Sequence, residues 1–291
     1  MIKNKLAINA KKVDKFLINY LKKQKYSLLI NPMKYGVLSG GKKIRSTIIF
    51  DAGKIFKINQ QKLVNICAAV ECIHSYSLIH DDLPCMDNDS IRRGKPSAHI
   101  RFGEASAVLA GNSLLTLAFE IIADENYFIS SNLKTEIIKN LALCSGHTGI
   151  AGGQELDLKF EKKKKNLKQI IDMQKKKTGK LFNFCLYAVA VIAKRNKKEK
   201  FFLGSLGEEI GLLFQFADDF LDIKGSKKLV GKPIKKDNKK GKSTLINLMG
   251  YEKAYKYANN LKKNILLKLK KHGKNASDLS NTIEFILGRN F

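Results

Sequence analysis

Four aspartates are crowded into nine positions of the segment HDDLPCMDNDSIRRG, which spans residues 80–94. Two arginines, Arg92 and Arg93, follow them at once. At the effective dielectric of a partly buried site, two carboxylates about 4 Å apart repel by roughly 4 kcal/mol. A divalent ion that prefers oxygen ligands, above all Mg²⁺, would offset this repulsion. Taken alone, the segment is equally consistent with a metal site and with an exposed turn at a helix end. The four residues are Asp81, Asp82, Asp87 and Asp89.

A second carboxylate cluster occurs in FQFADDFLD, residues 214–222. On an ideal helix Asp218 and Asp222 lie about 40° apart around the axis and about 6 Å apart along it, with Gln215 about 60° to the other side. Asp219 is the adjacent carboxylate. Unpaired carboxylates are costly to bury, so this polar stripe in an apolar segment indicates a solvated cavity or a bound metal. Two such clusters in one chain predict a site for metal ions and a diphosphate.

The elements that must position these clusters are helices. Pro84 predicts that the helix leading into the first cluster ends near Leu83, because proline cannot continue the backbone hydrogen bonds. The chain has only 4 Pro in 291 residues, and no linker rich in Pro, Gly or Ser divides it. No pair of alternating strands joined by Asn-Gly or Asp-Gly occurs. We therefore expect one helical domain over residues 1–291. Within residues 201–225, the apolar positions that share one helical face are Leu203, Leu206, Ile210, Leu213, Ala217 and Leu221.

The composition limits the choice of function. The net charge of +28 favours nucleic-acid binding at first sight. However, 54 basic residues less six Arg leave 48 Lys, which lie mostly in runs between apolar segments and accompany abundant Asn and Ile, as an AT-rich coding bias would produce. The longest apolar run, residues 184–193, is too short to span a bilayer, and the N-terminus lacks a signal-peptide pattern. We expect a cytoplasmic protein with no membrane span and no nucleic-acid partner.

Several motifs occur in the order found in the trans-polyprenyl diphosphate synthases, and through them the sequence resembles this family over nearly its whole length. They are DDLPCMD followed by RRG, FQFADDFLD, GGKKIRS at 40–46, ECIHSYSLIHDD at 71–82, FGEASAVLAGNSLLTLAFEI at 102–121, AGGQELDL at 151–158, KTGKLF at 177–182 and GKST at 241–244. The resemblance implies an all-α fold, a single-domain bundle of about ten or more helices around a central cavity, of the isoprenoid synthase type. It also implies a homodimer.

The resemblance is strongest to bacterial members that make farnesyl diphosphate. It implies that isopentenyl diphosphate is condensed with dimethylallyl and geranyl diphosphate through Mg²⁺-assisted ionisation, condensation and loss of a proton to the released diphosphate. Geranyl and geranylgeranyl diphosphate are alternative products. A terpene cyclase shares the ionisation chemistry but needs no isopentenyl site. A lysine-rich, helical nucleic-acid-binding protein is the alternative from another class.

The resemblance assigns roles to individual residues, and it implies more than one Mg²⁺ ion, bridged by the diphosphate. The strongest candidates for metal ligands are Asp81, Asp87 and Asp218. Weaker candidates, or residues just outside the ligand set, are Asp82, Asp219 and Asp222. The expected catalytic residues are Asp81, Asp218, Lys177 and Thr178. The expected contacts of the allylic diphosphate are Arg92, Lys177, Thr178, Gln215 and Lys232. The expected contacts of isopentenyl diphosphate are Gly41, Lys42, Arg45, His74 and Arg93.

Elementary helix geometry agrees with part of the isopentenyl site. His74 lies seven residues before the first aspartate and about 20° off its helical face, so both side chains point toward one cavity. Gly40 and Gly41 precede a helical segment, and exposed N–H groups at a helix start bind anions. The family's usual GGKRxRP is GGKKIRS here. Lys43 supplies charge without a bidentate fork, and Ser46 replaces a proline at the helix start.

Two neighbouring residues compete as the determinant of product length. Family members that stop at fifteen carbons tend to carry an aromatic residue five positions before the first aspartate motif and a two-residue insertion within it. Tyr76 and the spacing at residues 83–86 match both features. Ideal helix geometry, however, places Tyr76 about 140° from Asp81 and Ser77 only about 40° away. Geometry alone therefore indicates Ser77 as the floor of the pocket, whereas the resemblance indicates Tyr76.

Overall fold

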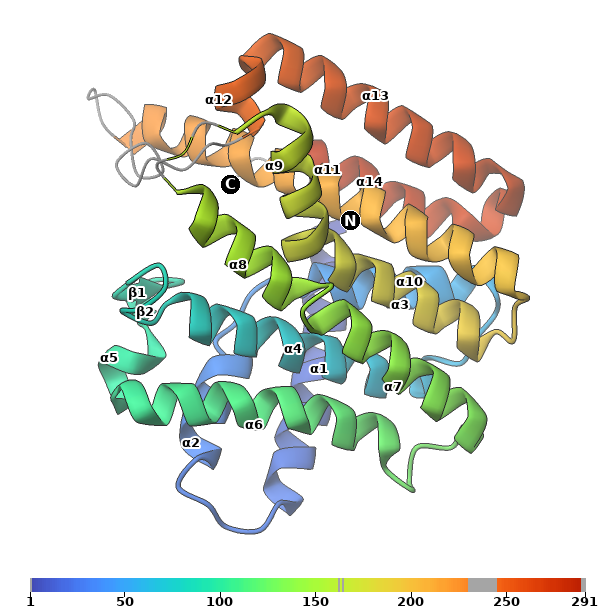
Figure 1. The fold of residues 1–291 in the computed structure, drawn as a ribbon. Coiled ribbons are helices and arrows are strands. Elements are labelled where there is room, and N and C mark those ends of the chain that lie inside the picture. Colours follow the sequence, from blue (N-terminus) through green and yellow to red (C-terminus); the bar gives the residue numbers. More distant parts are fainter. Residues whose placement is uncertain (1, 162, 164, 230–244, 289–291) are drawn as a thin grey trace. The chain divides into compact units, whose positions relative to one another are not determined.

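The computed structural model describes residues 2–161, 163, 165–229 and 245–288, and it is almost entirely helical, as predicted (Figure 1). The α-helices are α1 (Ile2–Lys23), α2 (Ile30–Val37), α3 (Ile44–Ile55), α4 (Val64–Asp81), α5 (Ala98–Phe102), α6 (Glu104–Ala123), α7 (Ser131–Ser145), α8 (Ile150–Phe160), α9 (Leu167–Gln174), α10 (Lys180–Ile192), α11 (Lys197–Leu229), α12 (Leu245–Met249), α13 (Tyr251–Leu269) and α14 (Ser277–Gly288). The tighter or wider helical segments are η1 (Gln60–Lys62), η2 (Lys175–Gly179) and η3 (Lys270–Ala276).

One short antiparallel ladder interrupts the helices. Its strands are β1 (Ile91–Arg92) and β2 (Lys95–Pro96), and Ile91 pairs with Pro96. The turn between them is Arg93 and Gly94, with φ of +53° and +74°. Positive φ at both central positions is the geometry of a tight two-residue hairpin turn. The sequence analysis, which looked for Asn-Gly and Asp-Gly turns, did not predict this hairpin.

The chain forms two compact units. The first comprises Met1–Leu141 and Ala188–Arg195, and the second comprises Ala142–Tyr187 and Asn196–Phe291. The first aspartate cluster and the residues expected to bind isopentenyl diphosphate lie in the first unit. The second aspartate cluster, Lys177 and Thr178 lie in the second. A single domain over residues 1–291 stays a prediction.

Helix α4 is the centre of the first unit. Residues 65–73 are all buried, so this helix is covered on every side. Helices α1, α2, α3 and α6 pack around it, and α4 and α6 lie side by side (Figure 1). A helix that is hydrophobic all round belongs in a core, and this burial holds its C-terminal end, with the first aspartates, in a fixed position.

Two described helices have the length and composition of a membrane span. In α4 and the turn before it, 78% of the apolar window is buried, which is typical of a core helix. In α6 the corresponding window is only 44% buried. Val108 and Leu109 of α6 are 38% and 51% exposed. Helix α6 thus packs on α4 with one face and leaves an apolar face uncovered.

Helix α11 organises the second unit, where η2, α13 and α14 pack against it. The apolar face predicted from sequence is confirmed over most of its length. Leu221, at the end of this face, is only half-buried. Its residues Leu203, Leu206, Ile210, Leu213 and Ala217 are buried. The aspartates of the second cluster follow on the next turn of the same helix.

Candidate active site

The first aspartate cluster is a helix end followed by a loop that folds back on it. Helix α4 ends at Asp81 and Asp82 caps it, which places the end two residues before the predicted Leu83. The backbone N–H of Asp87 donates to the carbonyl of Asp81 at 2.8 Å, and that of Asp89 donates to the carbonyl of Asp82 at 3.2 Å. The loop therefore returns the two later aspartates to the two earlier ones. The side-chain atoms that these aspartates can offer to a metal ion are carboxylate oxygens, which are the ligands that Mg²⁺ prefers.

Arg92 is paired within this cluster. Its Nε donates to the two carboxylate oxygens of Asp82 at 3.0 and 3.2 Å, and its Nη2 contacts Asp82 and lies 3.4 Å from Asp89 Oδ2. Burial raises the pKa of Asp82 even though Arg92 opposes it. Burial alone would lower the pKa of Arg92, but the hydrogen bond that it donates to Asp82, together with the charge of that carboxylate, raises the pKa overall. Asp82 thus holds Arg92, and Asp89, to which the sequence assigned no role, is a second partner.

The hairpin turn places Arg93 against the glycine loop. Arg93 Nη1 donates to Ser39 Oγ at 3.1 Å and to the carbonyl of Gly40 at 2.5 Å. A Cβ added to Gly41 would lie 2.9 Å from Arg93 Cζ, and the φ of Gly41 is +103°. The backbone conformation of Gly41 therefore favours glycine, and a side chain at this position would displace the guanidinium of Arg93. Arg93 itself has a positive φ, a strain that its contacts to this loop hold in place.

His74 stands in a positive environment. Burial lowers its pKa well below the ordinary value of 6.5, and the cations of Arg45, Arg93, Lys43 and Arg92 lower it further. The imidazole is therefore neutral at neutral pH. Arg45 and Arg93, which are also expected to bind isopentenyl diphosphate, are thus close enough to His74 to lower its pKa. Lys42 lies beside them in sequence, two residues before α3, with its side chain half-buried.

The two departures from the family's glycine motif have structural partners. Lys43 Nζ lies 3.1 Å from Asp14 Oδ1 and donates to the carbonyl of Val37 at 3.2 Å. Ser46 Oγ donates to the carboxylate of Glu71 at 2.6 Å, and both residues are buried. The serine therefore supplies a donor to a buried carboxylate that a proline could not supply. Glu71 in turn raises the pKa of Arg93, against the larger lowering effect of burial.

In the second unit, Lys177 and Thr178 lie on a π-helical turn. This turn is η2, and such turns are frequent at functional sites. Lys177 Nζ lies 2.7 Å from Asp157 Oδ2 of α8. A Cβ added to Gly153 of α8 would lie 2.2 Å from the backbone N of Lys177, so this glycine lets the two segments touch. Asp157 belongs to the motif AGGQELDL, and no role for it was predicted from the sequence.

The second aspartate cluster divides into a buried and an accessible part. Thr178 Oγ1 donates to Gln215 Oε1 at 3.2 Å, and Gln215 Nε2 donates to Asp219 Oδ1 at 2.9 Å. The backbone N–H of Leu245 reaches Asp219 Oδ2 at 3.3 Å. Burial raises the pKa of Asp219 to about 7, and the nearby charges of the other two aspartates act in the same direction. Asp218 is half-buried and Asp222 is exposed.

Lys232, expected to contact the allylic diphosphate, and the GKST motif lie outside the described residues. Among the residues that the structure does describe, no group of three or more His, Cys, Asp or Glu side chains is close enough to hold a metal ion by itself. Mg²⁺ commonly takes one or two carboxylates together with substrate phosphates, so pairs of aspartates within each cluster fit this ion.

Tyr76 and Ser77 are both buried, but they face different neighbours. Ser77 Oγ donates to the carbonyl of His74 at 2.9 Å, back along its own helix. Burial, and to a smaller extent the charge of Asp81, raise the pKa of Tyr76 to about 12. The ring of Tyr76 meets the ring of His80 edge-on, with centroids 5.7 Å apart. Which of the two residues limits product length stays a prediction.

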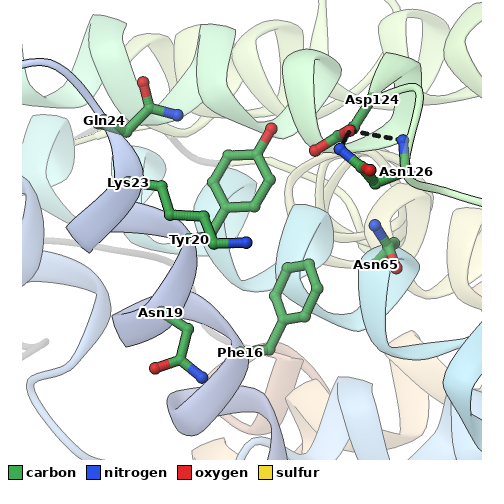
Figure 2. Close-up of a pocket in the computed structure, with 8 residues that line it drawn as sticks. All are labelled: Phe16, Asn19, Tyr20, Lys23, Gln24, Asn65, Asp124 and Asn126. Atoms are coloured by element: carbon green, nitrogen blue, oxygen red, sulfur yellow. Dashed lines mark hydrogen bonds between the residues drawn. The ribbon is translucent and has the colours of Figure 1, made fainter.

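Two cavities lie in the first unit. One, of about 30 Å³, is lined in part by Asp82, Arg92 and Ser39. The other, of about 350 Å³, contains none of the residues predicted from sequence (Figure 2). Its walls come from α1, the start of α4 and the loop after α6, and Figure 2 shows Asn126 bonded to Asp124 on one wall. Of these two cavities, the smaller one includes predicted site residues in its lining. The residues that line the larger one are Phe16, Asn19, Tyr20, Lys23, Gln24, Asn65, Asp124 and Asn126.

Comparison with known proteins places the chain in a family. The sequence model of the polyprenyl synthetases matches residues 26–284. The chain belongs to the polyprenyl synthetase family. It is 39% identical over 267 residues to the farnesyl diphosphate synthase of Escherichia coli (strain K12), covering 90% of this chain and 89% of that protein. The family resemblance stated from the sequence motifs is thereby confirmed.

Solved structures of family members confirm the predicted fold. An FPP/GFPP synthase from Zymomonas mobilis in its apo form has a TM-score of 0.87 and 36% identity, with 98% of each chain covered. A geranyltransferase from Helicobacter pylori, complexed with magnesium and isoprenyl diphosphate, has a TM-score of 0.79 and 32% identity. The alignment covers 98% of this chain and 96% of that one. The chain thus has the all-α fold of the isoprenoid synthases.

Proposed function

We propose that this protein is a short-chain prenyltransferase that condenses isopentenyl diphosphate with dimethylallyl and then geranyl diphosphate to make farnesyl diphosphate. The observation that carries the proposal is the cationic surround of neutral His74, made by Arg45 and Arg93 beside the glycine loop. Such a site suits a diphosphate held without metal. A terpene cyclase has no need of it, which favours a two-substrate condensation. The Escherichia coli relative, named a farnesyl diphosphate synthase, supports the same product.

In the proposed reaction, the isopentenyl diphosphate is held by Arg45, Arg93 and Lys42, with N–H groups of the loop at Gly41. The neutral ring of His74 adds a hydrogen-bond donor without adding charge. The double bond of this substrate attacks the allylic carbon as the C–O bond to the allylic diphosphate breaks. A new C–C bond forms, and one proton is then lost to the released diphosphate. No protein base is required for that last step.

The allylic diphosphate is the proposed partner of the aspartate clusters. Asp81, Asp87 and Asp218 are the proposed ligands of more than one Mg²⁺ ion, and this is consistent with the magnesium in the Helicobacter pylori structure. When bound, Mg²⁺ supplies charge that stabilises the departing diphosphate. Arg92 and Lys177 add fixed positive charge to the same leaving group. Thr178, Gln215 and Lys232 are the other proposed contacts of this substrate. Asp82, Asp219 and Asp222 are proposed as weaker metal ligands or as residues just outside the ligand set.

Product length is proposed to be limited by Tyr76. Its ring is buried beside the aspartate cluster, where the allylic chain begins. The hydroxyl of Ser77 is occupied along its own helix, so its contribution to the wall is the smaller one. Farnesyl diphosphate is favoured over geranyl and geranylgeranyl diphosphate on this basis.

We also propose that two copies associate through α6. Its apolar window is less than half buried, and Val108 and Leu109 are exposed on it. A second copy of the same face would remove this apolar surface from water. A cytoplasmic location and a single functional domain over residues 1–291 complete the proposal.

The direct test is incubation with isopentenyl and dimethylallyl diphosphates, with and without Mg²⁺, followed by chromatographic sizing of the products. We expect a fifteen-carbon product that requires Mg²⁺. Tight RNA or DNA binding at physiological salt without release of diphosphate from an allylic substrate would instead support the nucleic-acid alternative. Cyclic products from an allylic substrate alone would support a terpene cyclase.

A further inference from the structure

The imidazole of His80 occupies a slot between α4 and α6. His80 is the last residue before Asp81, and its Nε2 lies 3.1 Å from the carbonyl oxygen of Val108. A carbonyl can only accept a hydrogen bond, so Nε2 carries the proton in the neutral ring. On the other side, a Cβ added to Gly111 would lie 2.1 Å from this nitrogen. Gly111 therefore leaves space that the ring fills.

The same ring supports Tyr76. His80 lies one helical turn after Tyr76, and the two rings meet edge to face at an interplanar angle of 78°. Aromatic pairs prefer this arrangement because the positive edge of one ring faces the negative face of the other. The hydrogen bond to the Val108 carbonyl and the space left by Gly111 place the ring of His80 against α6. A contiguous set of contacts thus runs from α6 through His80 to Tyr76.

We propose that His80 is a positioning residue that fixes the ring of Tyr76 at the end of the product pocket, and that Gly111 is required to admit it. The inference rests on the proposed function, in which Tyr76 limits chain length. Product chain length would then depend on His80 and Gly111 as well as on Tyr76. A ring that could swing away would leave room for another isoprene unit, although Tyr76 itself would be unchanged.

The test is the product distribution of His80→Ala and Gly111→Ala with isopentenyl and dimethylallyl diphosphates. We expect the ratio of products longer than fifteen carbons to farnesyl diphosphate to rise about tenfold in each variant, the size of effect that a methylene-sized change has in an apolar pocket. Because Gly111→Ala could disturb folding, His80→Gln serves as a second variant. It keeps a donor for Val108 but lacks the ring edge, so we expect it to lengthen products as His80→Ala does.

The matched control is Gly53→Ala. A Cβ there would lie 2.2 Å from Leu63 Cδ1, which is a similar steric intrusion into the same unit but on α3, away from Tyr76. We expect its products to keep the wild-type ratio. If Gly53→Ala lengthens products as much as Gly111→Ala does, the effect is one of general destabilisation, and the proposal is overturned.

A double-variant comparison separates positioning from direct contact. If His80 acts through Tyr76, His80→Ala should add nothing to the longer products of Tyr76→Ala. If His80→Ala lengthens the products equally in the wild-type protein and in Tyr76→Ala, His80 acts on the prenyl chain directly. If folded His80→Ala and His80→Gln both still make farnesyl diphosphate as the wild-type protein does, His80 has no role in product length. Either result overturns the proposal. The proposed function fails separately, if the wild-type protein forms no prenyl product.

Discussion

Replacing Gly41 by Ala should weaken isopentenyl diphosphate binding selectively. Gly41 has a φ of +103°, and the new Cβ would lie 2.9 Å from Arg93 Cζ. The guanidinium would have to move and would lose its bonds to Ser39 Oγ and the Gly40 carbonyl. Hydrogen bonds of a charged group contribute about 1.5–3 kcal/mol each, part of which the diphosphate replaces. We take about 2 kcal/mol as the net loss, which corresponds to a roughly 30-fold rise in the KM for isopentenyl diphosphate.

Gly40→Ala is the matched control for this substitution. Gly40 also has a positive φ, +87°, but a Cβ there would meet nothing within 4 Å. Both variants carry the backbone strain of a non-glycine residue, about 1–3 kcal/mol, so the difference between them isolates the contact with Arg93. The assay is steady-state kinetics with each substrate varied in turn, together with urea unfolding. Equal KM changes in the two variants, or an equal rise in the KM for geranyl diphosphate, would refute the reasoning.

Three other predictions concern the remaining parts of the site. Asp81→Ala and Asp218→Ala should each lower turnover on the order of 100- to 1,000-fold with the helical circular dichroism intact, and near-normal turnover would exclude them as ligands. Tyr76→Ala should give products longer than fifteen carbons, and an unchanged product by chromatography would remove this ring as the limit. Because the pKa of His74 is lowered in the folded protein, unfolding releases a site that binds a proton more readily, so stability should fall as the pH drops below about 6.5. His74→Gln should flatten that part of the stability profile in urea titrations, and an identical profile would contradict the assignment.

The features that could be predicted from the sequence are those set by residues close together along the chain. The apolar face from Leu203 to Ala217 follows from helical spacing, and the end of α4 follows from Pro84 to within two residues. The two aspartate clusters were recognisable because like charges at close spacing are unfavourable without a compensating ion. The roles of the individual aspartates could not be predicted in the same way, because they depend on which side chains the fold brings close to each of them.

Long-range contacts account for what the sequence did not predict. No local pattern indicates that Arg92 would pair with Asp82 and Asp89, because the pairing follows from how the loop folds back. The π-helical turn at Lys177 has no compositional signature, and the contact of Gly153 with it joins two segments more than twenty residues apart. Ideal helix angles favour Ser77 and the family resemblance favours Tyr76, so the residue that limits product length stays a prediction.

The ion pairs of Arg92 and Lys177 have a consequence for how diphosphate binds. Each cation already contacts a carboxylate, Asp82 in one case and Asp157 in the other. A diphosphate that binds there exchanges one anionic partner for another, and the carboxylate takes the cation back when the product leaves. Added salt weakens the old pair and the new one together. If Arg92 and Lys177 bind the diphosphate as proposed, the ionic-strength dependence of allylic substrate binding should therefore be shallower than the number of basic residues around it suggests. The two carboxylates should then also assist release of the inorganic product.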